Sequence, residues 1–221
     1  MSTAQLPLSP DELLTTTRAV RRRIDCDRPV EREVVEELLS IALQAPTASN
    51  MQPWSFVVVT DPDTKAAIGE WYRRSWALYE EMPFAAGNLP YDDPVRKSLQ
   101  TRVMDSATYL AENYERMPVF IIPCLGMRPE AIDLPQSFVQ ATLYSSVIQA
   151  AWSIQLAARA RGLGSCWTTL HLLHEREIGE ILGIPPEIGQ TGLLTLGYVK
   201  GTDFKPAPRE ELDTKVHWER W

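Results

Sequence analysis

The segment 46–56 reads Pro-Thr-Ala-Ser-Asn-Met-Gln-Pro-Trp-Ser-Phe and leads directly into the β-branched run Val57-Val58-Val59. Its two prolines restrict the backbone, and the run that follows has the composition of a strand. Polar side chains between the prolines can hydrogen-bond a flat heteroaromatic ring; they are Thr47, Ser49, Asn50 and Gln52. Loops held rigidly at a strand end commonly carry binding residues. The segment therefore predicts a ligand-binding loop beside a strand.

The composition is that of an ordinary globular protein, since 44% of the 221 residues are hydrophobic and 23% are charged. The length fits one substantial domain or two small ones, and without a convincing internal boundary we expect one domain, residues 1–221. We expect no membrane association, because no apolar run could cross a bilayer and the first residues lack a hydrophobic signal core. Three cysteines without Cys-x-x-Cys spacing favour a reducing, cytoplasmic location. The net charge of −7 argues against nucleic-acid binding.

Helical and strand patterns interleave along the chain, which predicts an α+β fold, here a three-layer α/β/α arrangement. Ser9 and Glu12 form a capping box for a first helix, and Asp61-Pro62 begins another that runs to about residue 79. The expected helices are 29–45, 61–79, 95–116, 136–161 and 175–182. The expected strands are 57–59, 119–124 and 192–199, and residues 162–169 are expected to form a turn into a short strand. Residues 81–95, rich in prolines and aromatics, form a lid or a crossing segment, and the sequence leaves that choice open.

A cluster of six arginines lies between positions 18 and 32 against three acids, so this stretch is locally positive in an acidic chain. The cluster fits a solvated helix end equally well as an anion site, because guanidinium groups pair bidentately with phosphate.

Several common chemistries lack their motifs. No Gly-x-Gly-x-x-Gly follows a strand and no Walker lysine loop is present, so neither a Rossmann site nor a P-loop is predicted. His171 and His174 lack partners at zinc spacing, and we interpret both as structural. No general base accompanies Cys166 in a motif, which favours a small buried thiol.

Four blocks occur in an order that resembles the nitroreductase family of FMN-dependent oxidoreductases, closest to its actinobacterial NADH dehydrogenase or nitroreductase branch. They are Arg18-Ala19-Val20-Arg21-Arg22, residues 45–56, Gly162-Leu163-Gly164-Ser165-Cys166-Trp167, and Gly197-Tyr198 followed by Pro208-Arg209. Each block is weakly specific, but the four together extend over nearly the whole chain. Two positions depart from the Arg-Arg-Ser start of the family's first motif, since Thr17 and Ala19 stand where an arginine and a serine are common.

The resemblance implies a nitroreductase-like fold with a mixed, mainly antiparallel sheet, and a homodimer that binds FMN at its interface. It also implies that the tail 200–221 is exchanged with the partner subunit, and that the loop at 47–52 reaches the partner's flavin. Arg21 would lie near the N1–O2 edge of the ring, and Arg18, Arg22 or Arg23 would compensate at the phosphate. The implied cofactor-binding residues are Arg18, Ala19, Val20, Arg21, Arg22, Thr47, Asn50, Gln52, Thr168, Thr169, Leu170, Lys205 and Arg209.

By the same resemblance, the protein takes hydride from NADH or NADPH and reduces nitroaromatics, quinones or similar small-molecule acceptors by a ping-pong mechanism. The chemistry belongs to the flavin, so no catalytic side chain and no metal site are expected. Two alternatives stay open. One keeps the fold and flavin with another reaction, such as reductive dehalogenation or flavin fragmentation, and the other is a flavin-sequestering protein without turnover.

Overall fold

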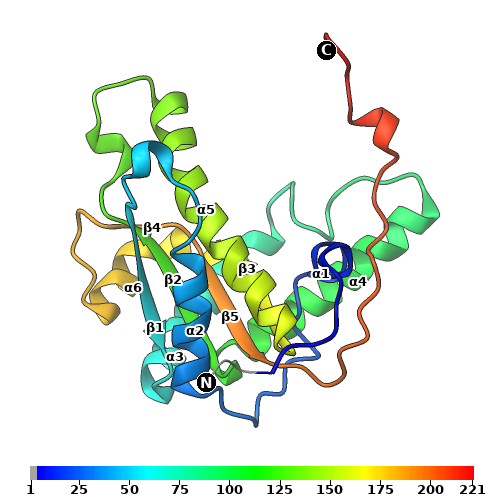
Figure 1. The fold of residues 1–221 in the computed structure, drawn as a ribbon. Helices are drawn as coiled ribbons and strands as arrows, with labels where there is room; N and C mark the ends of the chain where they lie inside the picture. The colour runs from blue at the N-terminus through cyan, green and yellow to red at the C-terminus, as the bar shows by residue number, and fades with distance from the viewer. Residues whose placement is uncertain (1–3) are drawn as a thin grey trace.

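The computed structural model describes residues 4–221 (Figure 1). Its α-helices are α1 (Pro10–Thr16), α2 (Arg32–Ala42), α3 (Pro62–Glu80), α4 (Pro94–Glu112), α5 (Gln136–Ala160) and α6 (Glu175–Leu182). Its strands are β1 (Trp54–Val59), β2 (Val119–Leu125), β3 (Leu163–Thr168), β4 (Gly189–Gln190) and β5 (Leu193–Tyr198). Short 3-10 helices are η1 (Ala48–Asn50), η2 (Tyr114–Arg116), η3 (Pro129–Ala131), η4 (Leu170–His174) and η5 (Leu212–Thr214).

The five strands form one sheet in the order β1-β2-β5-β3, with β4 paired to β2. All strand pairings in the described part of the chain are antiparallel, and a parallel contact occurs only as the isolated bridge between Ala19 and Ser165. The predicted mainly antiparallel α+β fold is therefore confirmed.

The central strand β2 explains why helices cover both faces of the sheet. Successive residues of a strand point to opposite faces, and every residue of β2 is buried. Val119 and Ile121 pack against α2 and α5, while Phe120 and Ile122 pack against α3 and α6. Figure 1 shows α2 and α5 on one side of the sheet and α3 on the other. This strand is the middle of a three-layer structure, as its continuous apolar sequence indicates.

The helix ends follow the predicted local signals. Ser9 accepts a hydrogen bond from the Glu12 amide, and the Glu12 carboxylate accepts one from the Ser9 amide, which completes the capping box. Asp61 caps α3 by accepting a hydrogen bond from the Thr64 amide. Gly183 ends α6 in the left-handed conformation, with φ of 65°, which glycine adopts without steric cost.

Several predicted boundaries were displaced: the helix expected over 29–45 ends at Ala42, and the strand expected from Val57 begins at Trp54. The second helix begins at Arg32 rather than at Pro29, because the chain stays extended through Glu31, the N-cap residue. The helix expected over 95–116 ends at Glu112, and η2 follows as a separate turn. Between α3 and α4 the backbone makes a series of turns rather than a further helix. No helix in the range 4–221 is long and apolar enough to cross a membrane.

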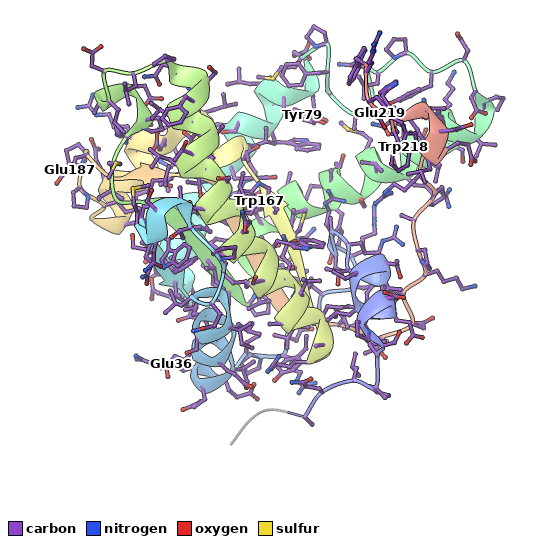
Figure 2. The ribbon with its side chains drawn as sticks, turned by 45° about the horizontal axis from the view of Figure 1, so that its top comes forward. Glu36, Tyr79, Trp167, Glu187, Trp218 and Glu219 are labelled. Carbon is purple, nitrogen blue, oxygen red and sulfur yellow. The ribbon has the colours of Figure 1, made fainter. Side chains whose placement is uncertain are left out.

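The tail 200–221 contains one short 3-10 helix and ends with exposed aromatic residues, including Trp218 at 83% exposure. Its first part crosses the arginine segment, and its later part lies along α4 of the same chain, where Glu210 forms an ion pair with Arg96. Figure 2 shows Trp218 and Glu219 far from Trp167, which lies close to α5. Exchange of this tail with a partner stays a prediction.

Candidate functional site: an arginine pocket beside strand β3

The arginine segment is fixed to the sheet by backbone contacts with β3. The Val20 amide donates to the Ser165 carbonyl at 2.8 Å, and Ala19 forms the parallel bridge with Ser165. Val20 is buried in the core, so its side chain contributes packing to the site rather than a ligand contact. A Cβ at Gly164 would lie 2.8 Å from the Val20 Cβ. A glycine in the Gly162–Gly164 motif therefore lets the arginine segment approach the strand closely.

Arginine side chains line a pocket of about 240 Å³ together with Ser106 of α4 and Phe204 of the tail. Arg21 donates from Nη1 to the Ser106 hydroxyl at 3.0 Å, but its buried Nε has no partner. Arg22 is exposed, donates to the Asp105 carbonyl and stacks over the Tyr109 ring at 4.9 Å. The pocket thus concentrates positive charge around a half-buried guanidinium that retains an unused donor, as a bound anion requires.

The tail closes one side of this pocket. Arg18 donates from Nη1 to the Lys205 carbonyl at 3.1 Å, and Arg23 donates to Asp203 at 2.6 Å. The Arg23 guanidinium also lies over the Phe204 ring at 4.3 Å. Arg209, further along the tail, is exposed and donates only to its neighbour, the Pro208 carbonyl. Among the predicted tail residues, Lys205 therefore joins the arginine segment through its backbone, whereas Arg209 stays free to turn toward a ligand.

The turn after β3, residues 168–170, is held from beneath by buried aromatic residues. The Thr168 hydroxyl lies 2.9 Å from the Tyr114 hydroxyl and donates to the Leu193 carbonyl. Tyr114 stacks on Tyr72 with ring centroids 3.7 Å apart. Burial raises the pKa of the Tyr114 hydroxyl well above its usual value, so it stays protonated. The Thr168 side chain points into the core, and the exposed Thr169 and half-buried Leu170 present the turn to the solvent side.

The loop 46–53 combines an unusual backbone with a firm attachment to α5. Ser49, Asn50 and Gln52 all have positive φ, between 48° and 53°, a conformation that side chains other than glycine adopt at a cost. Such strain in adjacent residues points to a functional site. The Thr47 hydroxyl accepts a hydrogen bond from the Gln52 amide, and the Ala48 amide donates to the Ser146 hydroxyl on α5. The loop predicted from sequence is therefore a rigid structure.

The predicted residues gather in two places rather than one. The arginine segment, β3 with its turn, and the first part of the tail lie together. The loop 46–53 contacts the N-terminal half of α5, whereas Leu163 of β3 follows its C-terminal end (Figure 1). No hydrogen bond links Thr47, Asn50 or Gln52 to the arginine pocket within the described residues. The predicted site residues of one chain therefore lie in two separate groups, which we call half-sites because the prediction assigns them to one cofactor.

A stripe of exposed apolar and small residues runs along α5. Its members are spaced three and four apart, as residues on one helix face must be: Phe138, Ala141, Ser145, Ile148 and Trp152. Phe138 is 60% exposed and Ile148 is 52% exposed, although the opposite face of the helix is buried in the core. Exposed apolar surface of this extent typically marks a protein contact. We call this surface the α5 stripe.

The comparisons with known proteins identify the family. The model of the Nitroreductase family matches residues 14–198. The chain belongs to the nitroreductase family. The match covers the arginine segment, the loop and β3, so the resemblance drawn from the four motifs is confirmed, while the actinobacterial branch stays a prediction.

Individual relatives and structures resemble this nitroreductase family member over most of its length. An NADH dehydrogenase of Thermus thermophilus is 29% identical over 227 aligned positions, covering 97% of this chain and 98% of the relative. A 5,6-dimethylbenzimidazole synthase of Rhodospirillum rubrum is 30% identical over 183 residues, covering 83% of this chain and 75% of the relative. The structure of oxidized iodotyrosine deiodinase bound to FMN and 3-iodo-L-tyrosine has a TM-score of 0.68 and 24% identity. It covers 94% of this chain and 98% of that one, and it supports the fold alone.

Several residues of the site escaped the sequence analysis. Ser106 and Phe204 lie far from the arginines in sequence and carry no motif, so no local signal marks them. Arg159, which lies 5.0 Å from the centroid of the Phe204 ring, could have been found from the sequence. It interrupts the apolar run 156–160 of the long helix, and a buried charged residue usually has a partner. His171 is fully buried, consistent with a structural role, and no group of residues within 4–221 could hold a metal ion.

Proposed function

We propose that this nitroreductase family member is an FMN-dependent oxidoreductase that takes hydride from NADH or NADPH and reduces a nitroaromatic, a quinone or a similar acceptor. The observation that carries the proposal is the arginine pocket attached to β3, inside the region matched by the family. The acidic chain concentrates six arginines between positions 18 and 32. An anionic cofactor accounts for that distribution better than a solvated helix end does, because part of the charge is buried.

The residues present fit a flavin phosphate and ring. Arg21 has a buried Nε without a partner, and the exposed Arg18 and Arg22 bracket it along the segment. Phosphate of charge near −2 placed in an apolar interface needs about two cations to be tolerated. When bound, FMN would supply the two-electron chemistry, accepting hydride from the nicotinamide and passing the electrons to the acceptor.

In this proposal the chain's own residues orient the flavin ring and tune its reduction potential. In this proposal Arg21 faces the pyrimidine edge of the ring, where its positive charge favours the reduced, anionic form. The turn 168–170, fixed through Thr168 and Tyr114, supplies backbone groups beside the ring. The loop residues Thr47, Asn50 and Gln52 offer hydroxyl and amide groups to a ring bound by a second copy. A pocket of this kind excludes water and leaves one ring face for two successive substrates, which agrees with ping-pong kinetics.

The proposed assembly is a homodimer. Two separated half-sites in one chain become one complete site if the loop 46–53 of one copy lies against the arginine pocket of another. The α5 stripe offers the apolar surface that such a dimer buries, and an isologous contact places the same stripe on both sides. In the dimer the tail would also reach the partner. We further propose a cytoplasmic location for the protein.

A second candidate keeps the fold and the cofactor but changes the reaction. The similarity to 5,6-dimethylbenzimidazole synthase at 30% identity makes flavin fragmentation a candidate reaction. The fold shared with iodotyrosine deiodinase makes reductive dehalogenation another. Steady-state oxidation of NADH with a nitroaromatic or a quinone separates the candidates, because the second predicts little turnover with either acceptor.

Anaerobic mixing of the purified protein with NADH, and separately with NADPH, tests the proposed function. We expect bound FMN to lose its oxidised absorbance with at least one donor and to regain it when an acceptor is added. Flavin that neither donor reduces would instead identify a flavin-sequestering protein. A preparation that contains no flavin and takes up none would refute both.

Replacing Arg209 should weaken FMN retention more than folding. Its side chain is exposed and bonds only its neighbour's carbonyl, so Arg209→Ala removes a phosphate-seeking cation without disturbing the core. We expect FMN affinity to fall about tenfold, the usual contribution of one charge-assisted hydrogen bond. Dialysis followed by fluorescence titration measures it. Arg220→Ala, which removes an arginine from the same tail, is the matched control, and wild-type retention in Arg209→Ala would count against the role.

A further inference from the structure

Arg159 is a buried cation whose charge is not balanced by any carboxylate within residues 4–221. It lies in the last turn of α5 and is only 4% exposed. Its Nη2 donates to the Thr16 hydroxyl oxygen at 3.2 Å, but its Nε and Nη1 are buried without an acceptor. No carboxylate in the described part of the chain pairs with it. An unpaired buried charge is strongly destabilising, so a group of opposite charge is expected at this place.

The surroundings of Arg159 are positive rather than neutral. Arg159 lies 5.0 Å from the centroid of the Phe204 ring, and Arg23 lies over the same ring at 4.3 Å. Burial lowers the pKa of Arg159, and the positive charge of Arg23 lowers it further. Asp203 pairs with Arg23 but is exposed, so it compensates the buried Arg159 poorly. Arg18 donates to the carbonyl of the next tail residue, Lys205, and so fixes the tail beside Phe204.

The same place lacks two groups that the family pattern would provide. Ala19 has no hydroxyl, and Thr17 stands where an arginine is common. The Thr17 hydroxyl donates to the Leu13 carbonyl at 2.6 Å, and the Thr16 hydroxyl donates to the Glu12 carbonyl at 2.6 Å. Neither hydroxyl proton is therefore available to an anion. The Thr16 oxygen instead accepts from Arg159, which holds the guanidinium beside the start of the arginine segment.

We infer that Arg159 binds the phosphate of the flavin directly, replacing the donors that Thr17 and Ala19 do not provide. The two free donors of Arg159, with Arg23 at the same Phe204 ring, form an anion site between the end of α5, the end of α1 and the tail at Phe204. Phosphate suits this site because its oxygens can accept from several guanidinium groups at once. The inference rests on the proposed function and adds to it the residue that selects FMN over the dephosphorylated riboflavin.

The test compares the affinities of FMN and riboflavin by fluorescence titration of the full-length protein. Arg159→Met keeps the length of the side chain and suits its buried, ring-stacked position, and Arg159→Gln serves as a second variant if the first fails to fold. We expect either substitution to weaken FMN binding between about tenfold and a hundredfold and to leave riboflavin binding within about twofold. The readout is the ratio of the two affinities, which a general loss of stability would not change.

Two control variants separate direct contact from indirect effects. Arg161→Gln removes another buried arginine from the same helix end, one that pairs with Glu37 instead, and it should leave the ratio unchanged. Phe204→Leu loosens the stacking on the tail while it keeps Arg159, and it should lower the ratio much less than Arg159→Met does.

The inference is overturned if Arg159→Met and Arg159→Gln keep the wild-type ratio of affinities. This result would follow if binding of FMN and riboflavin weakened equally, or if neither affinity changed. The inference is also overturned if Phe204→Leu lowers the ratio as far as they do, because Arg159 would then act through the tail. In each of these cases wild-type protein still binds FMN, so the proposed function stands. Wild-type protein that binds neither flavin refutes the proposed function and the inference together.

Discussion

Trp152→Glu should convert the protein from a dimer to a monomer and abolish its retention of flavin. Trp152 is 39% exposed at the C-terminal end of the α5 stripe, and an isologous contact along the stripe would bury it against the partner. A carboxylate buried in such an apolar surface without a partner costs several kcal/mol. We therefore expect the dimer dissociation constant to rise by at least about a hundredfold. Sedimentation velocity at micromolar concentration, with flavin absorbance recorded beside protein absorbance, measures both effects.

Ile181→Glu is the matched control for this prediction. Ile181 is 38% exposed, but it lies on α6, which packs on the opposite face of the sheet from α5. If the dimer interface runs along α5, this variant should remain dimeric and retain its flavin. A Trp152→Glu protein that stays dimeric with its flavin would place the contact elsewhere on the molecule. If wild-type protein binds flavin as a monomer, the proposal that the two half-sites come together in a dimer is refuted.

Local signals in the sequence predicted most of the fold, because neighbouring residues decide those features. Ser9 and Asp61 cap their helices through hydrogen bonds to amides three residues on, and Gly183 ends a helix through its own backbone freedom. The strand Val119–Leu125 reads as continuously apolar because helices cover both of its faces. The start of the second helix was misplaced, since Pro29 is as compatible with the observed extended backbone as with a helix.

The site was predictable only where a family motif carries it. The resemblance implied that the arginine segment and the end of β3 serve one cofactor, and the structure brings the segment into contact with β3. The proposed role of Arg159 depends on contacts with Thr16 and Phe204, which lie 143 and 45 positions away. Likewise, the inward orientation of Thr168 depends on Tyr114, which no motif connects to it. The loop with positive φ angles is also attached to Ser146 on α5, about a hundred positions away, a contact that no motif indicates. Long-range packing decides these features, and a single sequence does not encode it as a local pattern.

His171 should make the protein lose stability in mild acid. It is fully buried in η4, directly after the turn 168–170, and both of its ring nitrogens lack partners. Burial lowers its pKa from 6.5 to about 3. The unfolded chain then binds a proton near pH 6.5 that the folded chain refuses, so the free energy of unfolding falls as the pH decreases from 6.5 toward 3. Above pH 6.5 this contribution is fully present.

The expected loss is roughly 2 kcal/mol between pH 7 and pH 5, because each pH unit below 6.5 costs about 1.4 kcal/mol for one proton. Carboxylates whose pKa is lowered in the fold, such as Glu31 and Asp61, titrate below this window. His171→Leu removes the titrating group and replaces an unpaired polar ring by an apolar side chain, which the core accepts at little cost. Urea unfolding at pH 5, 6 and 7 should therefore show a steep decline for wild-type protein and a flatter one for the variant. If the free energy of unfolding depends on pH equally in wild-type protein and the variant, the folded protein accommodates a charged His171. The surroundings of the His171 ring would then be more polar than its burial indicates.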